Sequence, residues 1–402
     1  MNTNLGDSSC TGMNRRNFCA RTILAAGVGG LLAGCSQSAT APQFTTQAIT
    51  PLPRVSPLVH ANRTVTFLFE NPRSHSVQVL LNDQKPVAMT NNGRGLWTVT
   101  IGPMAPGIYN YALKVDGTWM LDPWNAWCRS SLFYAGSLFM VPGNPPKLWE
   151  DCNVPHGVVA RHFYHSNIVG DNRDYFVYTP PGYDSTVGRR YPVLYLLHGY
   201  SDLAAGWIKN GRANFILDNL IAQGKAKPMI VVMPLGYGDN RIVDRRIPHA
   251  YTRYWMDNAV AFRETLLQEI MPRIEQQYNV KTDRDHTAIA GLSMGGGESL
   301  FVGLNDLNRF AWIGGFSASL GRPDAAIFPR RFPKLSSHDN NRIRLLWLAC
   351  GRQDPVVGKE IRLLYPWLKA KGIHFTQVWT RGVHSWHVWR GNLAVFAPLL
   401  FR

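Results

Sequence analysis

The sequence has few acidic residues, few cysteines and, beyond its first segment, no long apolar run. Its 42 lysines and arginines outnumber 26 aspartates and glutamates, which gives a formal charge of +16 at pH 7. Such a balance favours acidic polysaccharides, lipid head groups or nucleic acids as surroundings. The basic residues are scattered, and no helix-turn-helix, zinc-finger or RNA-binding signature is present, so we expect no nucleic-acid partner. Because no later run approaches about eighteen apolar residues, we expect no membrane-spanning helix in the body of the chain.

The first 35 residues have the pattern of an export signal. A twin arginine, Arg15 and Arg16, precedes a short glycine-rich apolar run at 23–32, and Leu-Ala-Gly-Cys closes the segment at Cys35. The closing motif resembles the lipobox of bacterial lipoproteins, which implies acylation of Cys35. A plain secretory peptide with a coincidental cysteine is the alternative. We therefore expect export by the twin-arginine route and a lipid anchor on the bacterial membrane, in the periplasm or at the cell surface, with secretion as a further option.

Removal of residues 1–35, which hold three arginines and one aspartate, lowers the charge to +14. It also removes three of the six cysteines and leaves Cys128, Cys152 and Cys350. Their spacing matches no metal or redox motif, so we expect no metal and no cofactor. An oxidising destination permits one disulfide, for which Cys128 and Cys152 are the preferred pair. Residues 36–58 are rich in Ser, Thr, Ala, Gln and Pro and are expected to form a flexible tether.

Short alternating strands are predicted across residues 59–142. Apolar and polar residues alternate along four segments, at 64–69, 77–80, 96–101 and 109–115. Alternation at period two with frequent turns is typical of a small all-β sandwich. Three tryptophans near its end form either a stacking platform for sugar or, as we favour, a packing surface for the next domain: Trp119, Trp124 and Trp127.

This region resembles the immunoglobulin-like domain of carbohydrate-binding module family forty-eight. The matching motifs are Trp97, Pro-Gly-Ile-Tyr-Asn-Tyr at 106–111, Val-Asp-Gly at 115–117 and Asp-Pro at 122–123. Domains of this family accompany glycogen-branching enzymes and some esterases. The resemblance therefore implies an immunoglobulin-like sandwich in front of a carbohydrate-active domain.

A linker is expected at 143–155, and the remainder, 156–402, has the length of one α/β domain. Amphipathic helical stretches, such as 258–278 and 358–371, alternate with apolar runs. The runs are typical of buried parallel strands and lie at 193–197, 229–233, 287–290 and 343–348. This alternation predicts a doubly wound, mostly parallel sheet.

Residues 291–295 read Gly-Leu-Ser-Met-Gly between the run at 287–290 and a helical stretch. A strand, a Gly-x-Ser-x-Gly turn and a helix are the context of a nucleophile elbow, whose serine stands exposed above the sheet. The turn is so tight that glycines must flank the serine. A chance match in a glycine-rich loop is the alternative. The flanking strand and helix favour Ser293 as a nucleophile.

A serine nucleophile needs a base, and the base needs an orienting carboxylate. In proteins with a nucleophile elbow on a doubly wound sheet, the carboxylate and the histidine follow the serine along the chain, in that order. Asp354 comes just after the strand at 343–348, although it would also suit a helix cap. His384 follows the last strand, at 375–379, and His387 competes with it but is expected to begin a helix.

An oxyanion at Ser293 needs backbone N–H donors. The helix after the serine offers the N–H of Met294. The loop after the strand at 193–197 offers that of Tyr200, where Gly199 lets the backbone approach closely. We expect these two N–H groups to form an oxyanion hole.

Together the motifs resemble the esterase D-like α/β hydrolases, specifically carbohydrate esterase family one and its siderophore-esterase relatives. The match covers about 155–402 and rests on Pro-Pro-Gly-Tyr at 180–183, His198-Gly199, Trp207, Met233-Pro234, the elbow, Gly351-x-x-Asp354 and His384-x-Trp386-x-x-Trp389. It implies an α/β-hydrolase fold with Ser293, His384 and Asp354 as the triad. The family has glycine directly before the histidine, whereas Val383 stands here, which predicts a slightly displaced histidine loop.

The family and the sandwich in front imply a feruloyl or acetylxylan esterase that acts on plant polysaccharide through an acyl-enzyme. Three aromatics are expected to hold a phenolic acid by stacking, unless they pack in the core: Trp207, Trp386 and Trp389. A siderophore (enterochelin-type) trilactone esterase is the runner-up, because the positive charge suits an anionic ferric complex. Mycolyl-type acyl transfer is a third possibility. A non-catalytic carbohydrate-binding lipoprotein is the other class, which the intact Ser, Asp and His set disfavours.

Overall fold

The computed structural model describes residues 55–82 and 85–402. The signal segment with Cys35 and the predicted tether up to residue 54 lie outside the described residues. One compact unit is formed by Pro53–Arg402. In the part of the chain that is described, no helix combines the length and the apolar character needed to cross a bilayer.

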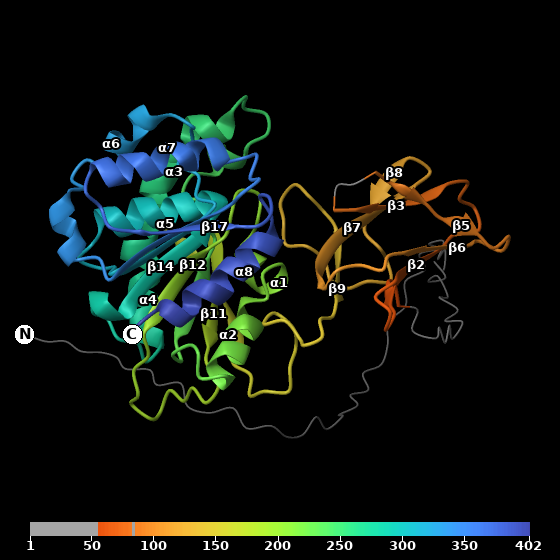
Figure 1. The fold of residues 1–402 in the computed structure, drawn as a ribbon, viewed down its shortest axis with the longest axis horizontal. Coiled ribbons are helices and arrows are strands. Elements are labelled where there is room, and N and C mark those ends of the chain that lie inside the picture. The colour runs from red at the N-terminus through yellow and green to blue at the C-terminus, as the bar shows by residue number, and fades with distance from the viewer. Residues whose placement is uncertain (1–54, 83–84) are drawn as a thin grey trace, which may run out of the picture. The chain divides into compact units, whose positions relative to one another are not determined.

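The N-terminal region is built from two antiparallel sheets (Figure 1). The first has the order β1-β2-β6-β5, formed by Leu58–Val59, Val65–Glu70, Leu96–Ile101 and Thr90–Asn91. The second has the order β4-β3-β7-β8, with β9 also paired to β7, formed by Val87–Ala88, Val77–Leu81, Gly107–Val115, Thr118–Met120 and Ser137–Val141. Alternate residues of β2 and β3 are buried, so Phe67 from one sheet and Val79 from the other share one core.

The C-terminal region contains an eight-stranded sheet of order β10-β11-β13-β12-β14-β15-β16-β17. Its strands are Val158–Ser166, Asp171–Thr179, Ile230–Pro234, Val193–Leu197, Thr287–Leu292, Trp312–Phe316, Leu345–Gly351 and Thr376–Thr380. Strand β11 pairs antiparallel with both of its neighbours, β10 and β13. All the other pairings, from β13 across the sheet to β17, are parallel. This is the doubly wound, mostly parallel sheet that the sequence predicts.

Helices cover both faces of this sheet (Figure 1). The α-helices are α1 to α8, at Gly206–Lys209, Ala213–Ala222, Ala250–Thr265, Met271–Gln277, Ser293–Asn305, Phe328–Arg331, Gly358–Ala370 and Trp386–Phe396. A π-turn, Leu266–Ile270, joins α3 to α4, and 3-10 turns lie at Asn240–Val243, Arg284–His286, Ala325–Ile327, Ser337–Asn341 and Ala397–Leu399. Side chains of α3, α5 and α7 form one buried cluster with the strands, and those of α2 and α8 form another on the opposite face.

The carboxyl ends of the parallel strands meet at one edge of the sheet. Leu197 of β12 lies beside Gly291 of β14, and Gly351 of β16 lies beside Thr380 of β17. The loops that follow β12, β14, β16 and β17 therefore converge at this edge, which is where open α/β sheets bind ligands.

The predicted Cys128–Cys152 disulfide is wrong, because both thiols are free, as is that of Cys350. The Cys128 thiol donates toward the carbonyl of Asn125 within its own loop. The loop that holds Cys152 is anchored elsewhere, since the carbonyl of its neighbour Glu150 accepts a hydrogen bond from the side chain of Asn219 in α2.

Candidate active site

The strand β14 turns sharply into α5 at Ser293. This serine has a φ of +51°, in the left-handed region that non-glycine residues rarely adopt. A Cβ at Gly291 would lie 2.4 Å from the Gly295 carbonyl oxygen, and one at Gly295 would lie 2.3 Å from that of His198. Glycine is therefore required on both sides of the serine, because a side chain would strike backbone. The geometry is that of a nucleophile elbow.

The three predicted triad residues come together at the carboxyl edge of the sheet. His384 Nε2 lies 2.9 Å from Ser293 Oγ, and His384 Nδ1 lies 2.8 Å from Asp354 Oδ2. A carboxylate can only accept, so the proton sits on Nδ1 and Nε2 is free to accept from the serine hydroxyl. The Asp354 side chain is fully buried and that of His384 is 14% exposed, which leaves the histidine accessible and its partner shielded.

Asp354 is held from both of its oxygens. Oδ1 accepts the backbone N–H groups of Val356 and Val357, each at 3.0 Å, so the helix-capping use and the histidine contact coexist. Burial is the largest influence on the Asp354 carboxyl and acts to raise its pKa, but the hydrogen bonds from His384 and Val357 outweigh it and lower the pKa. The carboxylate is therefore ionised at neutral pH and can stabilise an imidazolium.

The valine before the histidine does not prevent these contacts. Val383 is 48% exposed and lines a cavity beside His384, so its side chain is not packed beneath the histidine. Gly382, one position earlier, has a φ of +126° and takes the bend that glycine permits. Any displacement of the histidine loop thus leaves the hydrogen bonds of His384 in place.

The loop after β12 lies directly against the nucleophile. A Cβ at Gly199 would lie 3.3 Å from Ser293 Cβ, which places the adjoining Tyr200 peptide beside the serine. Met294 is the second residue of α5, whose first-turn N–H groups lack helical acceptors. The structure thus brings the backbone of both predicted oxyanion donors, Tyr200 and Met294, to the elbow.

His198 controls the orientation of that peptide. Its Nε2 accepts the Gly236 N–H at 2.9 Å, so Nδ1 carries the proton and donates to the Gly199 carbonyl at 2.8 Å. The Gly199 carbonyl and the Tyr200 N–H belong to the same planar peptide, so fixing one fixes the other. Burial lowers the pKa of His198 to about 4, which keeps the ring neutral and this tautomer stable.

The three tryptophans predicted to contact substrate take different positions. Trp207 is fully buried, and its indole N–H donates to the Leu197 carbonyl at 2.8 Å. The expectation that Trp207 stacks on substrate is therefore wrong, because neither ring face is open. Trp389 is 6% exposed and meets His384 edge-on at 4.9 Å, so it supports the histidine. Trp386 is partly exposed and lines a cavity beside His384.

Other aromatic side chains surround the elbow without having been predicted. The Tyr200 ring lies 5.0 Å from that of Tyr251 and 5.7 Å from that of Phe133. Tyr200 and Tyr251 also pack on the cluster that contains Met294. Phe133 comes from the loop between β8 and β9 of the N-terminal region, and Tyr251 from the start of α3. Neither lies in a recognisable motif, so spacing in the sequence offers no signal for them.

His387, the competing histidine, is the second residue of α8 and faces away from the serine. Its ring lies 6.4 Å from that of Trp149. Burial, and then the nearby Arg390, lower its pKa. The serine contact belongs to His384.

The fold and this site define an α/β hydrolase, in which a serine, a histidine and a carboxylate meet at the carboxyl edge of the sheet. The sequence model of the Esterase family ("Putative esterase") matches residues 166–399. The chain belongs to this esterase family and is of the carbohydrate esterase family one (CE1) type.

One curated protein and one solved structure support this assignment. An endo-1,4-beta-xylanase/feruloyl esterase of Xylanibacter ruminicola is 29% identical over 358 residues, covering 86% of this chain and 46% of the relative. The chain thus spans about half the length of that relative. The structure of a CE1 ferulic acid esterase from Anaeromyces mucronatus is 26% identical with a TM-score of 0.53, covering 63% of this chain and 93% of that one.

The fold also matches an enterobactin esterase from Shigella flexneri. That structure is 19% identical with a TM-score of 0.58 and covers 83% of this chain and 92% of its own. This match covers more of the chain than the match to the ferulic acid esterase does. At 19% identity, however, it shows only that the two proteins share a fold.

Proposed function

We propose that this chain is a serine esterase that releases ferulate, or acetate, from esters on plant polysaccharide. The observation that carries the proposal is the pair of contacts of His384, at 2.9 Å to Ser293 Oγ and 2.8 Å to Asp354 Oδ2. The named activities of the Xylanibacter and Anaeromyces relatives support the acyl group. The CE1 type supports the reaction.

The proposed reaction runs through an acyl-enzyme. Ser293 Oγ attacks the ester carbonyl as His384 Nε2 takes its proton, and the N–H groups of Tyr200 and Met294 stabilise the oxyanion. The carbon–oxygen bond to the alcohol then breaks, and the imidazolium returns the proton to the departing oxygen. Water, deprotonated by His384, hydrolyses the acyl-enzyme and restores Ser293. Asp354 keeps the imidazole in the required tautomer throughout.

The proposal includes an exported, lipid-anchored enzyme, supported by the twin arginine and by the lipobox-like motif at Cys35. It also includes a family forty-eight relationship for the β-region. Trp119 is 47% exposed on β8 and so has a ring available for sugar, whereas the Trp127 indole donates to the Lys209 carbonyl of α1. Carbohydrate contact is thus proposed for the former and packing for the latter.

The test is release of ferulate and acetate from feruloylated, acetylated arabinoxylan by the mature protein. Ser293→Ala should abolish release, and Ser185→Ala, the same change in an exposed loop, should leave it unchanged. Acetate release alone would identify an acetylxylan esterase. Equal activity of Ser293→Ala and wild type would overturn the proposal.

The second candidate is a siderophore trilactone esterase, which the charge of +14 on the mature chain favours through attraction to an anionic ferric complex. Hydrolysis of a catecholate trilactone, without ferulate or acetate release from arabinoxylan, would establish it. Steep loss of kcat/KM with added salt would accompany such a substrate, because screening weakens long-range attraction.

A further inference from the structure

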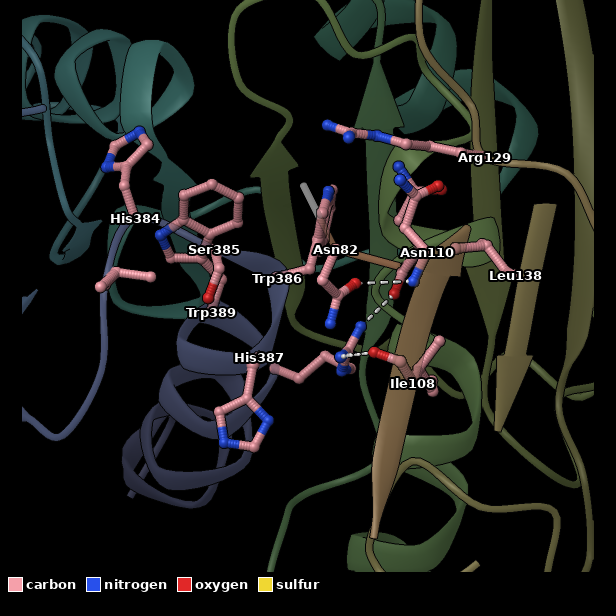
Figure 2. A pocket seen from close by; sticks show the side chains of 13 residues that line it. Asn82, Ile108, Asn110, Arg129, Leu138, His384, Ser385, Trp386, His387 and Trp389 are labelled. Carbon is pink, nitrogen blue, oxygen red and sulfur yellow. Dashed lines mark hydrogen bonds between the residues drawn. The ribbon is translucent and has the colours of Figure 1, made fainter. Parts of the chain in front are cut away.

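A cavity of about 350 Å³ lies beside the histidine of the triad (Figure 2). Its lining comes from both regions of the chain. In Figure 2, His384 stands at one end of the lining and Leu138 of β9 at the other, with Asn82 and Asn110 between them. The volume falls within the range of about 300–1,000 Å³ that is usual for small-molecule sites.

Hydrogen bonds hold the two walls of the cavity together. Leu132 N–H donates to the Ser201 carbonyl at 2.6 Å, and the Asn210 side chain both accepts from Ser130 N–H and donates to its carbonyl, at 3.0 and 3.2 Å. The Arg390 guanidinium donates to the carbonyl of Asn210 at 2.7 Å and to that of Ile108 in β7 at 3.3 Å. The cavity is thus built into one compact unit.

The lining is rich in donors and has no carboxylate among its residues, all of which belong to the described chain. Asn82 Oδ1 accepts the Asn110 backbone N–H at 2.9 Å. The two N–H groups of the Asn82 side-chain amide have no acceptor in the described residues. The Arg129 guanidinium lies 3.9 Å from Asp202, beyond direct hydrogen-bond reach. Arg390 is 2% exposed, and its Nε has no acceptor in the described part of the chain. Asn110 Oδ1 is buried too and has no donor in the described part of the chain. A ligand that enters must therefore bring oxygen acceptors and also a donor, as a hydroxyl group does.

The position of the cavity relative to the triad indicates which part of an ester it would bind. His384 lines the cavity, whereas Ser293 does not. When a tetrahedral intermediate collapses, the histidine gives its proton to the departing oxygen, so the alcohol portion must lie on the histidine's side. The partly exposed Trp386 adds an apolar surface of the kind against which sugar rings pack.

We propose that this cavity binds the saccharide residue that carries the ester and leaves as the alcohol. The inference rests on the proposed function and adds a contribution of the β-region to substrate binding. Amide and guanidinium N–H groups of Asn82, Asn110 and Arg129 donate to the hydroxyl and ring oxygens of the sugar. Methyl ferulate has the acyl group without the sugar and so leaves this cavity empty.

The test compares kcat/KM for a feruloylated arabinoxylo-oligosaccharide with kcat/KM for methyl ferulate. Asn82→Asp keeps the oxygen that accepts from Asn110 N–H but replaces the donor with a charged acceptor. We expect the ratio of the two constants to fall about 10-fold, mainly through KM for the oligosaccharide, as loss of one hydrogen bond predicts. Arg129→Lys keeps the charge near Asp202 but loses the planar fork, and should lower the ratio about 3-fold.

Asn62→Asp is the matched control, because Asn62 is an exposed residue of the same region whose side-chain oxygen also accepts a backbone N–H, that of Thr64. It should leave the ratio at the wild-type value. In a second measurement, free arabinoxylo-oligosaccharide should inhibit methyl ferulate hydrolysis competitively, and more weakly in Asn82→Asp. An unchanged ratio in both cavity variants, with both esters cleaved, would overturn the subsite alone. Cleavage of neither ester by wild type would instead overturn the feruloyl esterase activity in the proposed function.

Discussion

The two β regions of this chain bury their side chains in different ways. Along β2 every second residue is buried, whereas all five residues of β12 and all six of β14 are buried. Both faces of the central strands in the large sheet pack against helices, so only the residues at the strand ends can take part in chemistry. The strands of the sandwich keep one face and their connecting loops available, and it is from such positions that Asn82 and Arg129 reach the cavity. In both regions such residues lie in loops or turns that follow strands, but those of the hydrolase region carry the reaction, whereas Asn82 and Arg129 of the sandwich line the neighbouring cavity.

The sharpest test of this division is Asp354→Asn beside Asp116→Asn. The first change puts a donor opposite His384 Nδ1 and forces the wrong tautomer, so kcat should fall about 10⁴-fold. In the sandwich, Asp116 Oδ1 accepts the N–H groups of His75 and Ser76, and an amide oxygen can replace it there. Hydrolysis of a small ester should therefore be normal in Asp116→Asn. Similar activities in the two variants would mean that Asp354 does not orient the histidine.

Phe67→Ala asks whether the two regions unfold together. The Phe67 side chain is fully buried and meets Tyr111 and Phe139 edge-on, at 4.9 and 5.5 Å. Its removal should lower the free energy of unfolding by about 3–5 kcal/mol. Because both regions belong to one compact unit, we expect a single urea transition, followed by fluorescence and by residual esterase activity, to shift as a whole. Two separated transitions would contradict this.

His198→Ala tests whether the orientation of one peptide sets the rate. Loss of the bond to the Gly199 carbonyl should lower kcat about 10- to 100-fold with little change in KM, since a donor to the transition state is misplaced. His198→Asn offers an N–H at a position similar to Nδ1 and should recover part of kcat. Equal kcat values for the Ala and Asn variants would assign His198 to packing alone.

The smallest expected effect concerns Glu360 in α7, a buried carboxyl of the hydrolase region. Burial raises its pKa to about 8 from an ordinary value of 4.5, despite hydrogen bonds from Leu320 N–H and Ser319. Between these values the unfolded chain loses a proton that the folded chain retains, so the stability contributed by Glu360 falls as pH rises toward 8. Glu360→Gln removes this loss. We expect the variant to gain about 1–3 kcal/mol relative to wild type between pH 5 and 8, measured by urea unfolding at each pH.

The sequence predicts the sheet and the triad well because both depend on local patterns. The run at 193–197 coincides with β12, and the elbow and Asp354 each follow a strand whose apolar run is plain. His384 follows β17, a more polar strand that the sequence nevertheless predicts at 375–379. Strand β15, Trp312–Phe316, was not predicted, because its two glycines dilute the β-branched pattern that marks a strand. The helix predicted to begin at residue 258 begins at Ala250. Its first turns are rich in aromatic residues of low helix propensity, and the packing of Tyr251, Trp255 and Met256 on the core makes them helical.

Contacts between distant segments account for the remaining differences. Trp207 stands near the site in the sequence motifs, but the Leu197 carbonyl and the surrounding core hold it inside. The aromatic neighbours of Tyr200 come from positions 133 and 251, which only the fold brings together. The unformed Cys128–Cys152 bond has the same cause, because spacing along a chain does not reveal where each thiol is anchored.

The guanidinium of Arg390 has a consequence for the modularity of the chain. Arg390 comes six residues after His384 and lies in α8. Its guanidinium donates to the carbonyl of Ile108 in the sandwich. A hydrolase excised without its β-region would keep a charge below the surface with half of its acceptors gone. Moving the hydrolase region into another protein should thus require replacing Arg390 as well. Two segments that look in sequence like exchangeable modules therefore have to be engineered as one piece.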